Sequence, residues 1–306
     1  MINIVTIGGG NGHAIALRAL KQLKLDGSPF EITAIVNVAD NGGSSGRLRK
    51  EFNILPPGDL LRAAMALSDY DFLALRQFFY EQRFTDTHSK LAGHNVGNLL
   101  IKYLYDKTGS MLLALKELGI LWRLHGTVLP ATLDNVELCA ELENGEIVRG
   151  ETNIDVPQYD SQIRKKRVWL EPEGKLLPEA RQKLEKANYI VLGPGDLFTS
   201  ILPGLLISET YDKIKKSKAK IIFIAGLANR LKGETRNFTA VDFVRELHIF
   251  LPRQCDLFVG HNAAEPHNMQ LYTDKGWQWI TRNEDELSMP VVRGDLESET
   301  RAGMDY

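Results

Sequence analysis

Cysteine is scarce in this chain, which carries only Cys139 and Cys255 among its 306 residues. Two cysteines cannot form a metal cluster by themselves. An apolar run at residues 4–7 follows the first residues at once, so we expect no targeting segment. Reduced thiols and a cytoplasmic location are therefore expected.

Long hydrophobic runs and an excess of charge of either sign are also lacking. No stretch approaches the ~20 apolar residues of a membrane helix, so we expect no membrane partner. The net charge is only -2, which gives no broad electrostatic reason to expect a nucleic-acid partner. The hydrophobic content of 43% is ordinary for a globular chain. A chain of this length can bury about 75% of its unfolded surface.

Motifs for nucleophilic catalysis and for metal clusters do not occur. The sequence has no GxxxxGK[ST] phosphate loop, no G-x-S-x-G nucleophile turn and no Cys/His set with metal-ligand spacing. No catalytic residue can be assigned on this basis. The absences favour a protein that binds its ligand through backbone amides and polar side chains.

Glycine is concentrated near the start of the chain, directly after the apolar run at residues 4–7. That run is typical of a strand buried on both faces, and helical spacing begins at Ala14. A strand, a glycine turn and a helix direct amides and a helix N-terminus at one spot, where an anion can bind. The pattern resembles G-x-G-x-x-G, but His13 occupies the third glycine position. A bare turn without a ligand is the alternative. The glycines are Gly8, Gly9, Gly10 and Gly12.

A second apolar strand at residues 32–38 forms a βαβ unit with the first and predicts parallel pairing. The loops after both strands should then share the carboxyl edge of the sheet, where open α/β sheets bind ligands. Asp40 is placed to accept hydrogen bonds from a ribose. The run at residues 42–47 offers amides, hydroxyls and a guanidinium to an oxyanion, or is simply a flexible polar loop.

Three further polar segments are candidates for the same edge. Asp59 follows a Pro56-Pro57-Gly58 turn and is either a helix N-cap or a carboxylate facing the cleft. Residues 93–98 place His94, Asn95 and Asn98 at a helix start, with exposed amide donors. Residues 193–200 repeat the strand and glycine-loop pattern, with Thr199 and Ser200 as hydroxyl donors.

The alternation of strands and helices predicts an α/β fold, a three-layer Rossmann-like mostly parallel sheet with helices on both faces. We expect a single domain over residues 1–306. Alternating residues around Asn144-Gly145 predict a hairpin insertion at about residues 135–150. The last clear strand is at residues 256–259, and a C-terminal extension at about residues 261–306 shows no evident closing element.

Six segments, in their order along the chain, resemble the gluconeogenesis factor (YvcK-like) family, which shares a superfamily with the 2-phospho-L-lactate transferases (CofD). The likeness runs from residue 3 to about residue 296. It is carried by Gly8-Gly9-Gly10-Asn11-Gly12, the run at residues 38–47, Pro56-Pro57-Gly58-Asp59, Gly93-His94-Asn95-Val96-Gly97-Asn98, the run at residues 192–200, and Gly233-Glu234-Thr235.

The resemblance implies a Rossmann-like fold and a nucleotide diphosphate ligand. For gluconeogenesis factors it implies UDP-N-acetylglucosamine binding and a link to carbon metabolism, cell-wall precursor supply and cell shape. For the transferase branch it implies transfer of a phospholactyl group from a guanylylated donor to a deazaflavin, aided by Mg²⁺.

On the matched motifs, Gly10, Asn11 and Gly12 would carry the diphosphate. Tyr272 lies in a segment similar to the part of the family that contacts the sugar nucleotide. The complete set of candidate ligand residues is Gly9, Gly10, Asn11, Gly12, Asp40, Asn41, Gly43, Ser44, Ser45, Arg47, Asp59, His94, Asn95, Asn98, Gly193, Gly195, Asp196, Thr199, Ser200 and Tyr272.

Asn11 and Asn41 replace a threonine and a second aspartate that are usual in the family. Losing a carboxylate weakens a Mg²⁺-assisted transfer, and if Mg²⁺ is used its candidate ligands are Asp40 and Asp59.

We therefore expect a non-enzymatic nucleotide-sugar-binding regulator. A phospholactyl- or phosphoryl-group transferase is the alternative, and an NAD(P)-binding oxidoreductase is third. The candidate small molecules are thus a UDP-sugar, GDP or an NAD-like dinucleotide. A homodimer and a regulatory protein partner are also expected.

Overall fold

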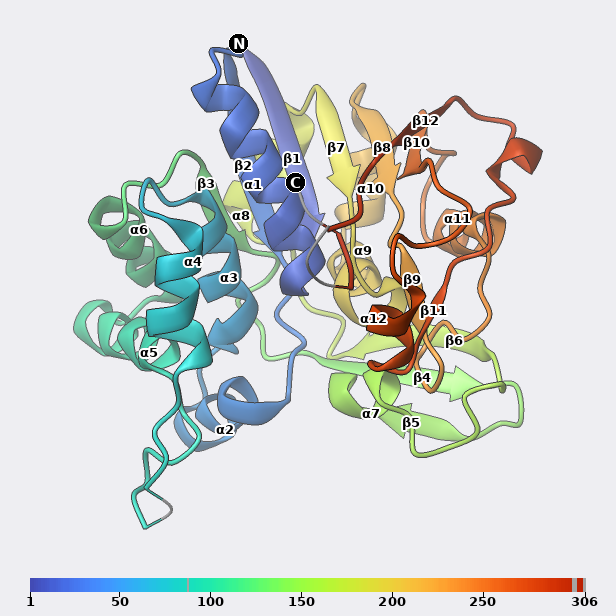
Figure 1. Cartoon of the computed structure of the whole chain (residues 1–306). Coiled ribbons are helices and arrows are strands. Elements are labelled where there is room, and N and C mark those ends of the chain that lie inside the picture. Colours follow the sequence, from blue (N-terminus) through green and yellow to red (C-terminus); the bar gives the residue numbers. More distant parts are fainter. Residues whose placement is uncertain (87, 299–301, 305–306) are drawn as a thin grey trace.

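A seven-stranded sheet forms the centre of the protein in the computed structural model, which describes residues 1–306 apart from 87, 299–301 and 305–306 (Figure 1). Every pair of neighbouring strands in this sheet is parallel, which confirms the predicted α/β class. In spatial order the strands are β12 (Val291–Gly294), β10 (Leu257–His261), β8 (Lys220–Ile224), β7 (Tyr189–Leu192), β1 (Ile2–Gly8), β2 (Phe30–Val36) and β3 (Thr127–Pro130).

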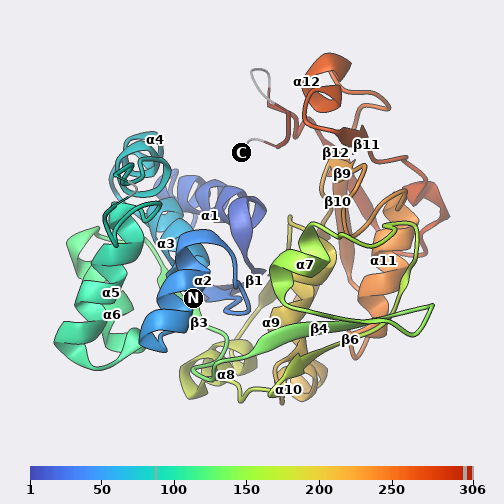
Figure 2. The ribbon, with the colours of Figure 1, turned by 90° about the horizontal axis from the view of Figure 1, so that it is seen from below.

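Helices cover both faces of the sheet. Helices α1 (Gly10–Leu25) and α3 (Pro57–Leu67) lie on one face, whereas α8 (Pro178–Glu185), α9 (Leu202–Leu206) and α10 (Thr210–Lys216) lie on the other (Figure 2). No helix in the described part of the chain combines the length and apolar character needed to cross a membrane. The remaining helices are α2 (Gly43–Phe52), α4 (Phe72–Leu75), the π-helix η1 (Arg76–Glu81), α5 (Val96–Thr108), α6 (Met111–Leu121), α7 (Glu151–Asp155), the π-helix η2 (Leu197–Ile201), α11 (Ala240–Ile249), α12 (Met269–Thr273) and the 3₁₀ helix η3 (Glu284–Glu286).

The order of the strands reverses between β1 and β7. The chain first builds β1, β2 and β3 outward in one direction, then returns to the other side of β1 and continues through β7, β8, β10 and β12. Loops on the two sides of such a reversal diverge, which leaves a crevice at the carboxyl ends of the strands. The fold therefore positions a ligand site beside the end of β1.

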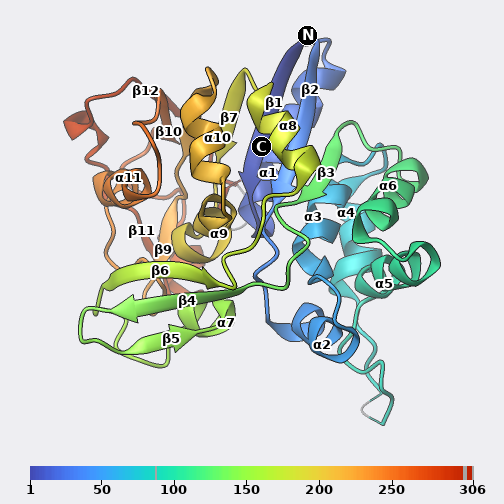
Figure 3. The same ribbon diagram turned by 180° about the vertical axis from the view of Figure 1, so that it is seen from behind.

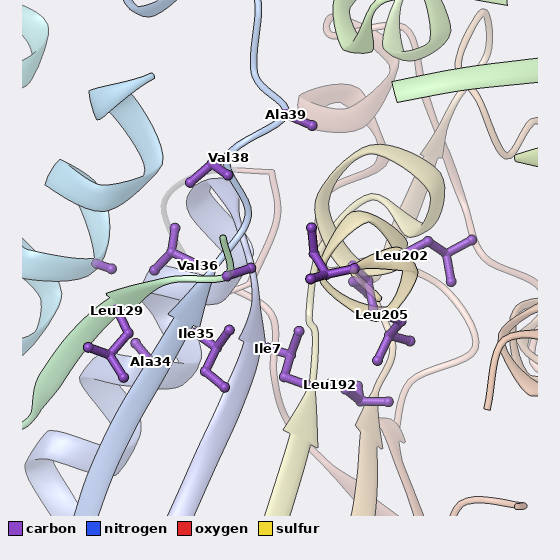
Figure 4. Close-up of a cluster of buried hydrophobic side chains, with 14 of the residues drawn as sticks. Ile7, Ala34, Ile35, Val36, Val38, Ala39, Leu129, Leu192, Leu202 and Leu205 are labelled. Atoms are coloured by element: carbon purple, nitrogen blue, oxygen red, sulfur yellow. The ribbon is translucent and has the colours of Figure 1, made fainter. Parts of the chain in front are cut away.

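The central strands are apolar because both of their faces are covered. Ile7 pairs in register with Ile35 on one side and Leu192 on the other, and all three are at most 1% exposed. Figure 4 shows Ile7 and Leu192 beside Leu205 of α9. Burying each such side chain contributes about 1.5–3 kcal/mol, so this row holds the two halves of the sheet together.

Two small antiparallel sheets accompany the main one. Strands β4 (Glu137–Leu142) and β5 (Ile147–Arg149) form the hairpin predicted from Asn144-Gly145, and β6 (Lys165–Glu171) pairs with the other edge of β4. This sheet lies near the carboxyl edge of the main sheet, next to α7 (Figure 3). The second small sheet pairs β9 (Ala228–Arg230) with β11 (Trp277–Trp279).

The prediction that no closing element follows residues 256–259 is wrong. Strand β12 pairs in parallel with β10 and forms one edge of the main sheet, and β11 pairs with β9. Both strands are short, and polar residues surround them in the sequence. Their apolar pattern is therefore too brief to be identified without the neighbouring strands.

The glycine-rich runs are more helical than predicted. Helix α1 begins at Gly10 rather than Ala14, so Gly10 and Gly12 lie in its first turn, whereas Gly9 is its N-cap and Gly8 ends β1. The run at residues 42–47, predicted as a loop, enters α2 at Gly43. Glycine and serine are weak helix formers, but burial of Ser44, Ser45 and Leu48 holds α2 in place.

Gly204 permits the close packing of α9 on β1. A Cβ at Gly204 would lie 2.5 Å from Cγ2 of the fully buried Ile7. We expect Gly204→Ala to lower the free energy of unfolding by about 1–3 kcal/mol, because enlarging a filled core forces neighbouring side chains to move. Chemical denaturation measures this change.

Gly119→Ala in α6 is the matched control. The nearest atom to its Cβ would be 3.6 Å away, an ordinary contact. We expect this change to be neutral or to add about 0.5–1 kcal/mol through helix propensity. Equal stabilities of Gly204→Ala and the wild type would contradict the packing argument.

Candidate ligand-binding cleft

A cleft of about 430 Å³ opens at the carboxyl edge of the main sheet. Its volume lies in the range of roughly 300–1,000 Å³ that small-molecule sites occupy. The walls come from the start of α1, the loops after β2, β7 and β8, helix α7 and the C-terminal segment. The sequence-predicted residues that line it are Gly10, Asn11, Gly12, Asp40, Asp59, Gly195, Asp196 and Ser200.

The first turn of α1 faces this cleft. Gly9 is the N-cap and provides no side-chain hydrogen bond to the helix. Gly10 has a φ of 68°, in the left-handed region that favours glycine. The first N–H groups of a helix have no partner within the helix and carry the positive end of its dipole. An anion in the cleft would therefore meet unpaired backbone donors.

Gly12 brings the second wall against the first. A Cβ at Gly12 would lie 2.4 Å from the carbonyl oxygen of Pro194, and one at Gly10 would lie 3.3 Å from Oγ of Ser200. The start of α1 and the loop after β7 thus touch through backbone. Glycine at residue 12 is required by this contact, whether or not a ligand is bound.

Asp40 and Asp59 form a pair of carboxylates on the cleft wall. A Cβ at Gly9 would lie 2.4 Å from Oδ2 of Asp59, so the glycine makes room for this carboxylate. Burial, followed by repulsion from Asp59, raises the pKa of Asp40. Arg62 donates to Asp59 and to the hydroxyl of Tyr80, which compensates one of the two negative charges.

Arg230 forms a second cluster of charges with two aspartates near the loop after β7. It donates to Asp155 at 2.7 Å and to Asp196 at 3.3 Å.

Glu151 also lines the cleft. Burial, and then the charge of Asp40, raises the pKa of Glu151 to about 9. Glu151 is therefore mostly protonated at neutral pH and presents a hydroxyl donor as well as an acceptor.

Several predicted residues lie behind the cleft wall, where they form a buried polar network. Oγ of Ser44 is 2.8 Å from Nδ1 of His94 and accepts from Asn98 at 3.0 Å. Oγ of Ser45 accepts from the N–H of Gly58 at 3.1 Å, and Asn95 caps α5 by accepting from the N–H of Asn98. These bonds fix α2 and α5 against the turn that carries Asp59, so the residues position the wall rather than line it.

The other predicted residues also stand outside the lining. Asn41 accepts two hydrogen bonds from Thr152, and Arg47 donates to the carbonyl oxygen of Ala92. Thr199 accepts from Asn37 through its carbonyl oxygen at 2.8 Å. Gly43 lies in the first turn of α2. A Cβ at Gly193 would lie 2.5 Å from the carbonyl oxygen of Ile224. Direct ligand contacts of these residues stay predictions.

Tyr272 is fully buried and does not line the cleft. Its hydroxyl accepts from the N–H of Gly303 at 3.1 Å, and its ring packs against Trp277 and Trp279. Gly303 itself lines the cleft. Tyr272 therefore positions the C-terminal segment that carries Gly303, and does not itself line the cleft.

Most of the charged side chains that line the cleft are not among the residues predicted from the sequence. Arg62 could have been found, because it lies three residues after Asp59 on one helix face. The others follow no glycine run or motif, and only the fold brings them to the cleft. They are Arg76, Glu151, Asp155, Arg230 and Lys275.

The donors present fit a magnesium ion only in part. No group of three or more His, Cys, Asp or Glu suited to a metal occurs in the described part of the chain. Asp40 and Asp59 offer two carboxylates, and Mg²⁺ is commonly held by one or two carboxylates together with water and substrate phosphates. A Mg²⁺ ion here would therefore depend on a phosphate ligand.

The fold and the cleft together define a Rossmann-like α/β protein with a polar ligand cleft at its topological switch point. A family model described as 2-phospho-L-lactate transferase CofD matches residues 4–296. The chain belongs to the CofD family, and curated relatives named gluconeogenesis factors cover most of it.

Two curated relatives illustrate the similarity. The chain is 41% identical to the gluconeogenesis factor of Bacillus subtilis over 246 residues, which are 80% of this chain and 74% of that protein. It is 36% identical to the putative gluconeogenesis factor of Thermotoga maritima over 297 residues, or 95% and 89% of the two chains. A crystal structure of a UPF0052 family member from Bacillus halodurans matches with a TM-score of 0.88 and 34% identity, covering 100% of this chain and 96% of that one.

Protonated Glu151 makes stability depend on pH. Its pKa rises from 4.5 to about 9 on folding, so the folded state holds the proton more tightly than the unfolded chain. The contribution of Glu151 to the free energy of unfolding is complete below pH 4.5. It is lost as the pH rises towards 9, with a slope of at most about 1.4 kcal/mol per pH unit. We expect Glu151→Gln to remove this slope, so that the variant is more stable than the wild type at pH 8.

Denaturation at pH 5 and pH 8 tests this expectation. Glu143→Gln, at an exposed glutamate in the turn between β4 and β5, is the control and should follow the wild type. A Glu151→Gln variant with the same pH profile as the wild type would show that Glu151 is ionised in the folded protein.

Proposed function

We propose that this protein binds a nucleoside-diphosphate sugar of the UDP-N-acetylglucosamine type in the cleft and acts as a regulator rather than an enzyme. The observation that carries this proposal is the meeting of the α1 N-terminus with the loop after β7 in one cleft. Backbone amides and a helix dipole are what a diphosphate needs. The cleft requires no nucleophile for this task.

The charges of the cleft favour a ligand with hydroxyls as well as phosphates. Four cationic side chains line it, and four aspartates accompany them. Carboxylates accept hydrogen bonds from sugar hydroxyls, whereas the cations and the α1 amides attract phosphate oxygens. Inorganic diphosphate has no sugar hydroxyl to donate to the aspartates, and its negative charge would be repelled by them. The cations are Arg62, Arg76, Arg230 and Lys275, and the aspartates are Asp40, Asp59, Asp155 and Asp196.

The names of the relatives support a role in carbon metabolism. Curated relatives are called gluconeogenesis factors, a name that mentions gluconeogenesis and states no reaction. We propose that this protein acts in the cytoplasm, that it links carbon metabolism to cell-wall precursor supply and cell shape, and that it works as a homodimer with a regulatory protein partner.

A phospholactyl transferase is the second candidate. The matching family model carries that description, and Asp40 and Asp59 could hold a Mg²⁺ ion against a bound diphosphate. In that case the α1 amides would stabilise charge on the phosphoryl oxygens.

Thermal unfolding with four ligands separates the candidates. UDP-N-acetylglucosamine, GDP, NAD and a deazaflavin are each tested with and without Mg²⁺. A ligand present at 100 times its Kd should add about 2.7 kcal/mol to the free energy of unfolding. We expect this gain with UDP-N-acetylglucosamine and without Mg²⁺. Stabilisation by GDP only with Mg²⁺, together with none by the sugar nucleotide, would favour the transferase and reject the first proposal.

Lys275→Met tests the cleft directly. Lys275 is an exposed cation that lines the cleft and lies over the ring of Trp277 at 4.9 Å. Removing one charge-assisted contact of about 1.4 kcal/mol should weaken UDP-N-acetylglucosamine binding about tenfold in a calorimetric titration. Lys186→Met, at an exposed lysine outside the cleft, should bind like the wild type. If Lys275→Met binds UDP-N-acetylglucosamine as tightly as the wild type, the wall of the cleft that carries Lys275 does not contact the ligand.

A further inference from the structure

Glu234 is a buried carboxyl group that the proposed function does not use. It lies in the Gly233-Glu234-Thr235 segment, in the turn after β9, and the residue is 5% exposed. Thr235 of this segment lines the cleft, whereas Glu234 is not among the lining residues. Oε1 of Glu234 instead accepts from the N–H of Phe198 at 2.7 Å. Glu234 therefore connects the turn after β9 to the start of η2.

Hydrogen bonds fix the turn that carries Glu234. Oγ1 of Thr235 donates to Oδ1 of Asn229 at 3.1 Å, and Asn229 donates to the carbonyl oxygen of Phe238 at 2.8 Å. Lys165 of β6 donates to the backbone carbonyl oxygen of Glu234 at 2.8 Å. These bonds do not involve the carboxyl group, so they remain when the side chain of Glu234 is changed. The turn is therefore a fixed support from which the carboxyl group reaches η2.

The bond to Phe198 takes the place of an ordinary helix cap. The first N–H groups of a helix have no acceptor within it, and an N-cap aspartate normally accepts from the second or third of them. Asp196 is the N-cap residue of η2, yet its side chain makes no hydrogen bond to the helix. Phe198 is the second residue of η2, and its N–H is bonded to Glu234. Glu234 thus does from a distance what Asp196 would do locally.

Asp196 is consequently directed at the cleft. Its carboxylate accepts from Arg230 at 3.3 Å, and both side chains line the cleft. The backbone carbonyl oxygen of Asp196 accepts from the N–H of Ser200 at 2.9 Å, and Ser200 lines the cleft as well. The start of η2 therefore sets the positions of two lining residues.

The charge state of Glu234 suits this task. Burial, followed by repulsion from Asp196, raises the pKa of Glu234 to about 8, although Lys165 opposes the rise and Asp155 adds to it. Glu234 is therefore mostly protonated at pH 7, and it accepts from Phe198 without adding a negative charge near the cleft. A glutamine has nearly the shape of this neutral acid and carries the same acceptor oxygen.

We propose that Glu234 is a positioning residue of the cleft, because it accepts from the N–H of Phe198 and so leaves Asp196 directed at Arg230 and the ligand. Without the acceptor oxygen of Glu234, Asp196 turns to cap η2 and leaves the cleft wall. The expected loss of ligand affinity rests on the proposed function. The exchange of caps at η2 does not, because it can be tested in the free protein.

Two substitutions of Glu234 separate its acceptor oxygen from its shape. Glu234→Gln keeps the oxygen, whereas Glu234→Met has a similar length and only a weakly accepting sulfur. In calorimetric titration with UDP-N-acetylglucosamine, we expect Glu234→Met to bind at least about tenfold more weakly than the wild type and Glu234→Gln to stay within about twofold. Wild-type affinity of Glu234→Met, or an equal loss in both variants, would overturn the proposal. Glu173→Met, at an exposed glutamate outside the cleft, is the control and should bind like the wild type.

A double-mutant cycle with Asp196→Ala distinguishes positioning from general destabilisation. We expect Asp196→Ala to weaken binding in the wild-type background but to add less than about twofold in the Glu234→Met background, because Asp196 has already left the ligand there. Additive losses would reduce Glu234 to a structural role and reject the proposal. An Asp196→Ala single variant that binds like the wild type would reject it too.

Melting temperatures of the free protein test the exchange of caps without a ligand. We expect Asp196→Ala to lower the melting temperature by at least about 2 °C more in the Glu234→Met background than in the wild type, because only there does Asp196 cap η2. Equal shifts in the two backgrounds would overturn the exchange of caps. If the wild type fails to bind UDP-N-acetylglucosamine, the proposed function is rejected, and this thermal cycle still decides whether Glu234 holds η2.

Discussion

The contact between Gly12 and the carbonyl oxygen of Pro194 sets the geometry on which the cleft depends. These groups are so close that a Cβ at residue 12 would lie 2.4 Å from the oxygen. The contact joins the end of β1 to the end of β7, the two strands between which the sheet reverses its order. The α1 N-terminus and the loop after β7 therefore become two walls of one cleft, and both direct backbone groups into it.

Charge in this cleft is balanced by pairing and by proton uptake. Arg62 compensates Asp59, and Arg230 compensates Asp155 and Asp196. Glu151 has no cationic partner among the described residues. Burial, and then the charge of Asp40, raises its pKa to about 9, so it takes up a proton instead. A buried carboxylate is costly unless it is paired with a cation or protonated. Because the acids of the cleft are paired or protonated in this way, they leave the α1 amides available to an anion.

The predicted strand ends did converge on one edge of the sheet, because parallel pairing follows from βαβ connections. What failed was the distinction between lining and support. Ser44, His94 and Asn98 belong to the same kind of sequence motif as the residues that line the cleft. Ser44 is nevertheless hydrogen-bonded to His94 and to Asn98 behind the cleft wall. A motif shows that a polar residue is needed at a position, whereas its direction depends on how α2 and α5 pack. Arg230 and Lys275 had no motif at all and reach the cleft through β9 and the segment after α12.

The sequence by itself determined the α/β class, the parallel pairing and the glycine turn that starts α1, because these depend on local periodicity and on the space that glycine leaves. The family likeness also followed from the motifs alone, and the comparisons confirmed it. Only the tertiary structure decided which polar groups meet. Residues as distant as Asp40, Glu151 and Arg230 become neighbours through strand order, and their charges and free donors depend on burial, which no stretch of sequence contains.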